Sequence, residues 1–174
     1  MINDAKIHDI AVGYVRKSVL SSILSCIIVG TRHPSLAPYL QLDEGELVLV
    51  SAFFSKTNWY AFTTRRIVSQ FQGILQSIEP SPGIVADFPN FKGYEFPESD
   101  EDWGKPGVVR RDVAMIRAAN SDSTVQFQYE TWETAMAPMY AVKYWQIKHP
   151  FLDKLMTSEE LYNYKTARAL QNGA

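Results

Sequence analysis

The sequence predicts an α+β fold in which a central series of β-strands lies between helices at the two ends of the chain. Between residues 46 and 130, apolar residues occur in short continuous or alternating runs separated by turn residues, a pattern typical of strands. Near the N-terminus and after residue 131, they recur at steps of three and four, which indicates helices. A chain of 174 residues with 46% hydrophobic composition can form one domain with a sizeable core.

The N-terminal segment has the features of an amphipathic helix. Asn3 can cap it, and Asp4 in the first turn is favourable near the positive end of the helix dipole. We expect the helix to run from Asp4 to Val29 and to end where Gly30 adopts a left-handed conformation. Its apolar face is formed by Val12, Val15, Val19, Ile23 and Cys26.

Residues 18–30 can also be interpreted as the apolar core of a signal peptide, because Arg16 and Lys17 precede them. Residues 23–26 (ILSC) resemble a bacterial lipoprotein cleavage site. Two upstream aspartates and four serines within the run favour the helix instead. The run is also shorter than the roughly 20 apolar residues that a membrane-spanning helix needs.

A hairpin with one core face is predicted after the connector at residues 32–38. Residues 47–54 form a nearly continuous apolar run, which predicts a strand buried on both faces or covered by the N-terminal helix. In the following hairpin, Phe62 pairs with Ile67, which leaves Arg65 in the turn and Arg66 on the outer face. The predicted core face consists of Tyr60, Phe62, Ile67, Ser69 and Phe71.

The second half of the chain changes from strands to helices. Strands are expected at residues 74–78, 108–118 and 125–130, with a long irregular stretch at residues 84–107. A helix capped by Thr131 or Thr134, with Pro138 in its first turn, is predicted to end at His149 and Pro150. A last helix is expected between residues 157 and 173.

Two segments carry a resemblance to a known family: ELVL at residues 46–49 and YAFTTRRIV at residues 60–68. With the order of the predicted elements, they resemble the bacterial pleckstrin-homology-like (PH-like) domains. The resemblance implies a partly open β-barrel of two antiparallel, orthogonal sheets at residues 41–156, plugged by the helix around residues 140–147. Residues 1–40 would form an N-terminal helix and connector, and residues 157–174 a C-terminal helix. The resemblance also implies binding or scaffolding more often than catalysis.

Composition argues against several functions. A net charge of −2 gives no overall attraction to nucleic acid or to an anionic membrane. The single cysteine excludes an intramolecular disulfide and a multi-cysteine metal site, and it fits a reducing compartment such as the cytoplasm. His8, His33 and His149 lie in three separate elements, and no glycine-rich phosphate loop occurs. We therefore predict no enzyme, cofactor or metal site, with an enzyme site under the long loop as an alternative.

The stretch at residues 84–107 combines aromatic and acidic residues, which predicts a protein-binding surface if the rings are exposed and a lid on the core if they fold back. A scaffold or an immunity-type inhibitor would fit this hypothesis, and the oligomeric state stays open. Binding of anionic lipid through Arg65 and Arg66 is the alternative. Trp103, Trp132 and Trp145 fit either core or contact. The predicted partner-binding residues are Asp87, Phe88, Phe91, Tyr94, Phe96, Glu98, Asp100, Glu101, Asp102 and Trp103.

Overall fold

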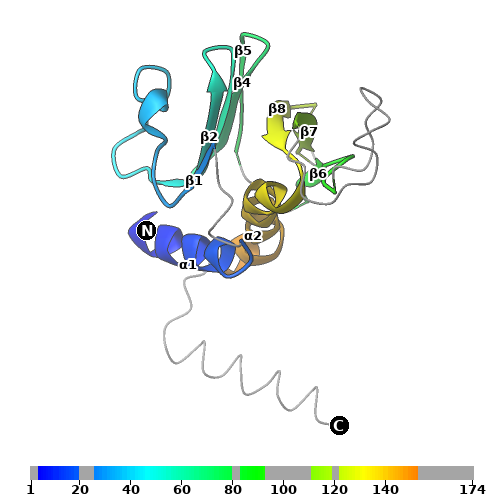
Figure 1. Ribbon diagram of the computed structural model, residues 1–174. Helices are drawn as coiled ribbons and strands as arrows, with labels where there is room; N and C mark the ends of the chain where they lie inside the picture. The colour runs from blue at the N-terminus through cyan, green and yellow to red at the C-terminus, as the bar shows by residue number, and fades with distance from the viewer. Residues whose placement is uncertain (1–3, 20–25, 80–82, 93–110, 119–121, 153–174) are drawn as a thin grey trace, which may run out of the picture.

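Two antiparallel sheets and two α-helices form the part of the chain that the computed structural model describes, residues 4–19, 26–79, 83–92, 111–118 and 122–152 (Figure 1). The predicted α+β class is confirmed. The first sheet has the strand order β1-β2-β3-β4-β5, and the second β6-β7-β8. The elements are α1 (Asp4–Arg16), β1 (Ile27–Val29), a 3-10 helix (Pro34–Leu36), β2 (Val48–Ser55), β3 (Asn58–Thr63), β4 (Ile67–Phe71), β5 (Ile74–Ile78), β6 (Val85–Asp87), β7 (Arg111–Arg117), β8 (Thr124–Glu130), a second 3-10 helix (Trp132–Ala135) and α2 (Met136–Leu152).

The β3–β4 hairpin has the predicted register, with Phe62 opposite Ile67. Tyr60, Phe62 and Ile67 are fully buried on its inner face, where the rings of Tyr60 and Phe62 pack against Phe127 of β8. Because side chains alternate between the two faces of a strand, the pairing of Phe62 with Ile67 is enough to determine which side chains point to the core.

The outer face of β2, β3 and β4 is buried as well, which agrees with the prediction that residues 47–54 form a strand buried on both faces. The connector after β1 folds back over it, and Leu36 and Leu40 pack with Trp59, Ala61 and Val68 in a second apolar cluster. As predicted, the connector holds no strand, only the 3-10 helix Pro34–Leu36. Strands β2, β3 and β4 therefore lie between two cores.

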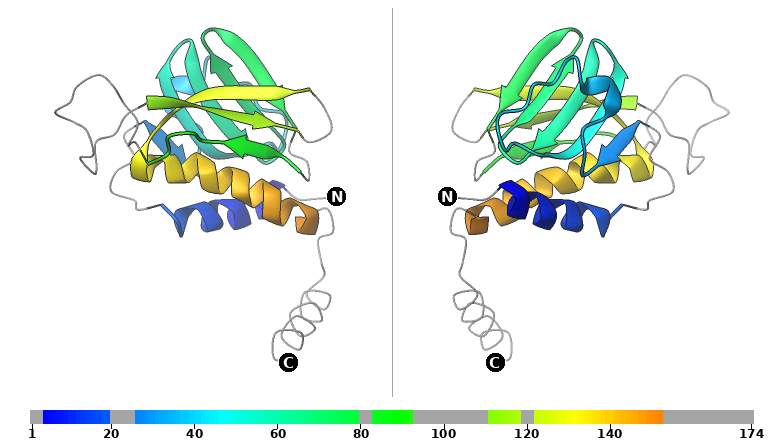
Figure 2. Two further views of the ribbon diagram at one scale, coloured as in Figure 1. Left: turned by 90° about the vertical axis from the view of Figure 1, so that its right-hand side faces the viewer. Right: turned by 90° about the vertical axis from the view of Figure 1, so that its left-hand side faces the viewer.

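In the part of the chain that the structure describes, backbone pairing does not close the two sheets into a barrel. Figure 2 shows β7 and β8 crossing the strands of the first sheet. Side chains make the junction: the Ser69 hydroxyl donates to the Gln126 carbonyl at 2.6 Å, and the Gln126 N–H donates to Gln76 Oε1 at 2.6 Å. The prediction of two antiparallel sheets is confirmed, whereas the partly open barrel that the resemblance implies is not confirmed.

The N-terminal helix is shorter than predicted. α1 ends at Arg16, and Ile27–Val29, expected to be helical, form strand β1, with Ile27 opposite Ala52 of β2. Three consecutive β-branched residues favour a strand once an edge is available for pairing. Gly30 has a positive φ of 90°, as predicted, but it follows a strand rather than a helix. Of the predicted apolar face, Val12, Val15 and Val19 are buried, Cys26 is half-buried, and Ile23 lies outside the described residues.

The helices cover one end of the sheets. α2 lies below the two sheets and α1 packs against it (Figure 2), with Tyr14 and Tyr140 in edge contact at 5.7 Å. Ala11 and Val15 of α1 join the same buried cluster as the strands, so the N-terminal helix packs on its own domain.

Two features of α2 concern its predicted ends. Pro138 lies in the first turn as predicted, whereas the Thr134 hydroxyl donates to the Thr131 carbonyl and Thr131 makes no side-chain capping bond. The helix continues through Pro150 to Leu152, so the predicted end at His149 and Pro150 is wrong. The helix predicted at residues 157–173 lies outside the described residues.

Candidate functional site

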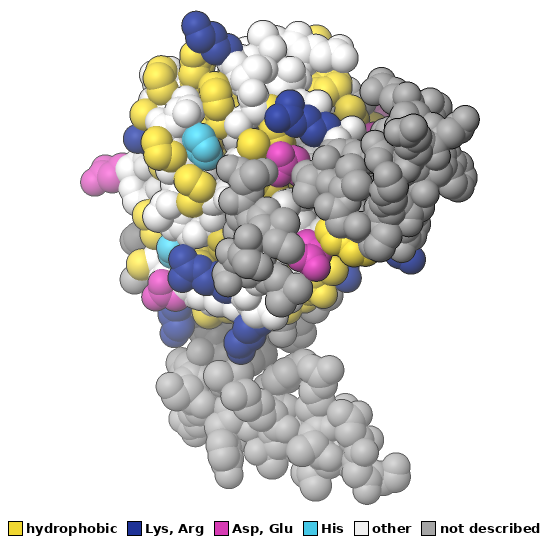
Figure 3. Space-filling view, in the orientation of Figure 1, with side chains coloured by type: hydrophobic (Ala, Val, Ile, Leu, Met, Phe, Trp, Pro, Cys, Tyr) yellow, Lys and Arg dark blue, Asp and Glu magenta, His cyan; other side chains and the backbone are white. Residues whose placement is uncertain are grey.

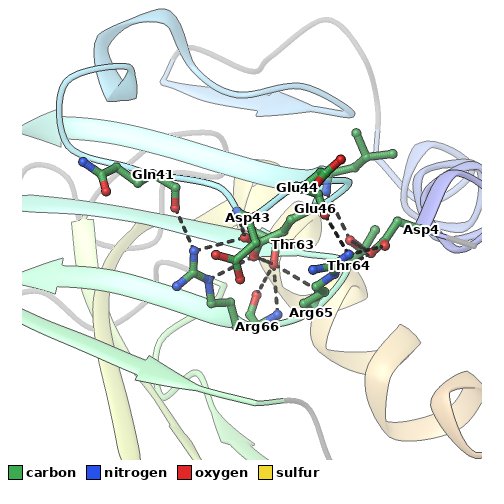
Figure 4. A network of polar contacts seen from close by, with 10 residues as sticks. Asp4, Gln41, Asp43, Glu44, Glu46, Thr63, Thr64, Arg65 and Arg66 are labelled. Carbon is green, nitrogen blue, oxygen red and sulfur yellow. Dashed lines mark hydrogen bonds and ion pairs between the residues drawn. The ribbon is translucent and has the colours of Figure 1, made fainter. Parts of the chain in front are cut away.

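The turn between β3 and β4 places Arg65 beside the first residue of α1 (Figure 4). Its guanidinium group donates to both Asp4 carboxylate oxygens, at 3.2 and 2.9 Å, and to the Glu44 carbonyl at 2.9 Å. Thr64 also donates its hydroxyl to Asp4. The hydrogen bond from Arg65, which outweighs the effect of burial, lowers the pKa of Asp4, and the same bond raises the pKa of Arg65.

Arg66 forms a bidentate pair with Glu46. Its Nε and Nη2 donate to the two Glu46 oxygens, both at 3.0 Å, and Nη2 also donates to the Gln41 carbonyl at 2.7 Å. The Glu46 side chain is 0% exposed, and it accepts further bonds from the Thr63 hydroxyl at 2.6 Å and the Asp43 N–H at 2.9 Å. Burial alone would raise the pKa of Glu46, but the bonds from Arg66 and Thr63 lower it overall.

Both arginines therefore form hydrogen bonds and ion pairs inside the protein. These interactions connect the hairpin turn with the start of α1 and with the chain before β2. A lipid headgroup site needs several converging cations. On the face shown in Figure 3, basic and acidic side chains of the described residues are interspersed. The internal contacts explain Arg65 and Arg66 without a ligand, and binding of anionic lipid through them stays a prediction.

The segment after β6 contains the described part of the predicted partner surface. Asp87 is exposed, at the end of β6. Phe88 is half-buried, with its ring in edge contact with Phe127 at 6.0 Å and Tyr129 at 5.2 Å. Phe91 is half-buried against the same core. The described rings thus fold back, as the lid interpretation requires. The remaining predicted residues, Tyr94, Phe96, Glu98, Asp100, Glu101, Asp102 and Trp103, lie outside the described residues.

A pocket of about 190 Å³ lies beside this segment, and its wall is mainly apolar. It forms where the end of the β6 segment meets the chain between β8 and α2. The Trp132 N–H donates to the Phe91 carbonyl at 2.6 Å, which holds the two segments together. The residues that line the pocket are Phe91, Lys92, Trp132, Glu133 and Met136.

The backbone at the pocket is strained. Trp132 has a φ of 66°, in the left-handed region that bulky side chains rarely occupy. Such a conformation persists only where the surrounding structure fixes it, and it recurs at ligand-binding sites. Here Trp132 is held in this conformation by the hydrogen bond from its N–H to the Phe91 carbonyl and by the 3-10 helix Trp132–Ala135, which begins at this residue.

Two of the side chains that line the pocket, Lys92 and Glu133, carry charged groups. The Lys92 ammonium lies 5.8 Å from the centre of the Phe91 ring. Glu133 Oε2 is buried and has no hydrogen-bond partner. Sites for drug-sized molecules usually measure about 300–1,000 Å³, so this pocket fits one side chain rather than a whole cofactor.

Four of the five pocket residues were not predicted. Of the three tryptophans that fitted either core or contact, Trp145 is buried in the core and Trp132 lines the pocket. Lys92 lies within the predicted stretch at residues 84–107 but is neither aromatic nor acidic. Glu133 and Met136 show no local pattern that marks them, because the pocket arises from contact between segments far apart in the sequence. Phe91 was predicted as a contact residue, and it links the prediction to the pocket.

The side chains of His8 and His33 serve the fold. His8 Nε2 lies 2.9 Å from the Gly30 carbonyl and 3.1 Å from the Val48 carbonyl, and His33 Nδ1 accepts from the Ser35 N–H. Within the described ranges, no group of three or more histidine, cysteine or acidic side chains is placed to hold a metal ion. None of the helices in those ranges is both long and apolar enough to cross a bilayer.

Comparison of the chain with protein-family models, with curated proteins and with solved structures finds no match. The PH-like resemblance therefore stays a prediction.

Proposed function

We propose that the chain is a non-enzymatic protein-interaction module with a PH-like core, and that it receives a side chain of a protein partner in the pocket beside Trp132. The observation that carries this proposal is the pocket itself, a mainly apolar recess of side-chain size held by a strained tryptophan. Contact surfaces gain most of their affinity from a few aromatic and apolar residues in such recesses.

The PH-like assignment is supported by the order of the elements. Seven strands, β2 to β8, are followed by α2. Six of these strands lie where the sequence predicts strands, whereas β6 (Val85–Asp87) lies in the stretch that was expected to be irregular. The family that the chain resembles implies binding or scaffolding.

The proposal also refines the surface that the sequence indicated. Phe91 belongs both to the predicted contact residues and to the pocket, whereas Phe88 packs against Phe127 and Tyr129. We therefore place the contact at the start of the predicted surface, around Phe91 and Lys92. Lys92, which lines one side of the pocket, is exposed.

Affinity capture from the native host with identification by mass spectrometry tests the proposal. Met136→Arg fills the pocket with a long charged side chain and should reduce capture of the partner at least about ten-fold, the change that a loss of 1.4 kcal/mol produces. Met115→Arg is the matched control, because Met115 is half-buried on β7 and does not line the pocket. Circular dichroism checks that both variants fold. Equal capture by the wild type and both variants would contradict the proposal.

A further inference from the structure

Glu133 lines the pocket, and one of its two carboxylate oxygens, Oε2, is buried without a hydrogen-bond partner. Buried polar atoms nearly always have a partner, and an unpaired one weakens the folded state. The last torsion of a glutamate side chain rotates broadly, so a carboxylate oxygen can turn towards a donor in the pocket. A ligand with N–H groups would supply that donor.

The aromatic part of the pocket already attracts a positive charge. The Lys92 ammonium lies 5.8 Å from the centre of the Phe91 ring, within the range of a cation–π contact. Lys92 is exposed, and its long side chain can swing away at little cost. A second cation can therefore take its place over the ring.

We propose that the pocket binds the cationic side chain of an arginine or a lysine of the protein partner, between the rings of Phe91 and Trp132, with Glu133 as its counter-ion. The inference rests on the proposed function. The apolar wall, including Met136, suits the aliphatic stem of such a side chain, and the carboxylate suits its charged end. The volume of about 190 Å³ agrees with one side chain. A net charge of −2 adds a weak overall attraction for a basic partner.

Titration of the ¹⁵N-labelled full chain with three small probes tests the inference. The probes are the acetylated methylamides of arginine, lysine and norleucine, and the readout is the indole N–H signal of Trp132, assigned by its loss in Trp132→Phe. The arginine or the lysine probe should shift this signal with saturation, and norleucine, which has the stem without the charge, should not. The stronger of the two cationic probes shows which side chain the pocket prefers.

Two variants test the roles of the charges. Glu133→Gln keeps the shape and removes the charge, so it should weaken binding of the cationic probe about ten-fold. Lys92→Ala removes the competing ammonium and should strengthen binding several-fold. The other amide signals of each variant report whether the fold is unchanged.

The outcomes separate this inference from the proposed function. Equal binding of norleucine and of the cationic probes, or no effect of Glu133→Gln, would overturn the cationic inference; loss of partner capture in Met136→Arg would then still support the proposed function. Absence of any shift with all three probes would also overturn the inference. If Met136→Arg captures the same partner as the wild type, the proposed function fails independently of the titration.

Discussion

Replacement of Arg66 by alanine tests whether the polar network at the β3–β4 turn holds the fold together. The change leaves the Glu46 carboxylate buried, with its bonds from Thr63 and Asp43 but without its counter-ion. Loss of one partner of a buried pair costs about 3–5 kcal/mol. The Arg66 side chain is 29% exposed, so water can reach part of the site and we expect the lower end, about 3 kcal/mol.

Urea unfolding followed by tryptophan fluorescence measures this loss. With a slope of about 2 kcal/mol per molar urea, a loss of about 3 kcal/mol lowers the midpoint by about 1.5 M. A double variant, Glu46→Leu with Arg66→Met, removes both charges and should recover most of the stability, because an apolar pair of similar size avoids the cost of a buried charge. A loss below about 1 kcal/mol for Arg66→Ala, or no recovery in the double variant, would refute the reasoning.

The pH dependence of the same variant gives a second check. In the wild type the pKa of Glu46 is lowered from 4.5, so its contribution to stability is present above pH 4.5 and is lost as the pH falls through the lower folded value. Arg66→Ala lacks this contribution at neutral pH. The difference in unfolding free energy between the two proteins should therefore be largest near pH 7 and should narrow below pH 4.5. A difference that is constant with pH would contradict the assignment to Glu46.

Two further predictions concern stability. Gly30→Ala should lower the free energy of unfolding by about 1–2 kcal/mol, because Gly30 has a φ of 90° and a Cβ would lie 3.2 Å from Val12 Cγ1. Gly13→Ala should raise it by about 0.5–1 kcal/mol, because Gly13 lies inside helix α1 and a Cβ there would meet no atom within 4 Å. A change of the same sign for both variants in urea unfolding would count against this explanation. Ser69→Ala combined with Gln76→Ala removes both side chains that hydrogen-bond to the Gln126 backbone. The double variant should lose about 2 kcal/mol of unfolding free energy and show faster hydrogen exchange at the Gln126 amide. Unchanged exchange would mean that other contacts hold the two sheets together.

The parts of the fold that the sequence predicts are those determined by local alternation. The register of Phe62 with Ile67 fixes the inner face of the hairpin, and the run at residues 47–54 is apolar enough to indicate a buried strand. β1 was missed because apolar residues at steps of three and four fit a helix equally well. Only the edge of β2, with Ala52 opposite Ile27, determines that this segment is a strand, and that contact is long-range.

Contacts between segments far apart in the sequence also determine the roles of Arg65 and Arg66. The same is true of the pocket. A pair of arginines at a hairpin turn suggests a free cationic site until Asp4 and Glu46, from two other segments, are placed beside it. The pocket exists because Trp132 and Phe91 meet through a backbone hydrogen bond. Neither contact follows from periodicity or turn chemistry. Phe91 of the aromatic segment after β6 lies in the pocket wall, and its role as a contact residue stays a prediction.

Site-specific photo-crosslinking tests most directly whether a protein partner binds at the pocket. A photoreactive amino acid is placed at Lys92, which lines the pocket and is exposed, and in a separate control protein at Lys56, which is exposed in the turn between β2 and β3. Irradiation in lysate of the native host should join the partner to position 92 and not to position 56, and the Met136→Arg change should abolish the product. A partner that crosslinks from position 56 alone, or a product at position 92 that survives Met136→Arg, would contradict the account.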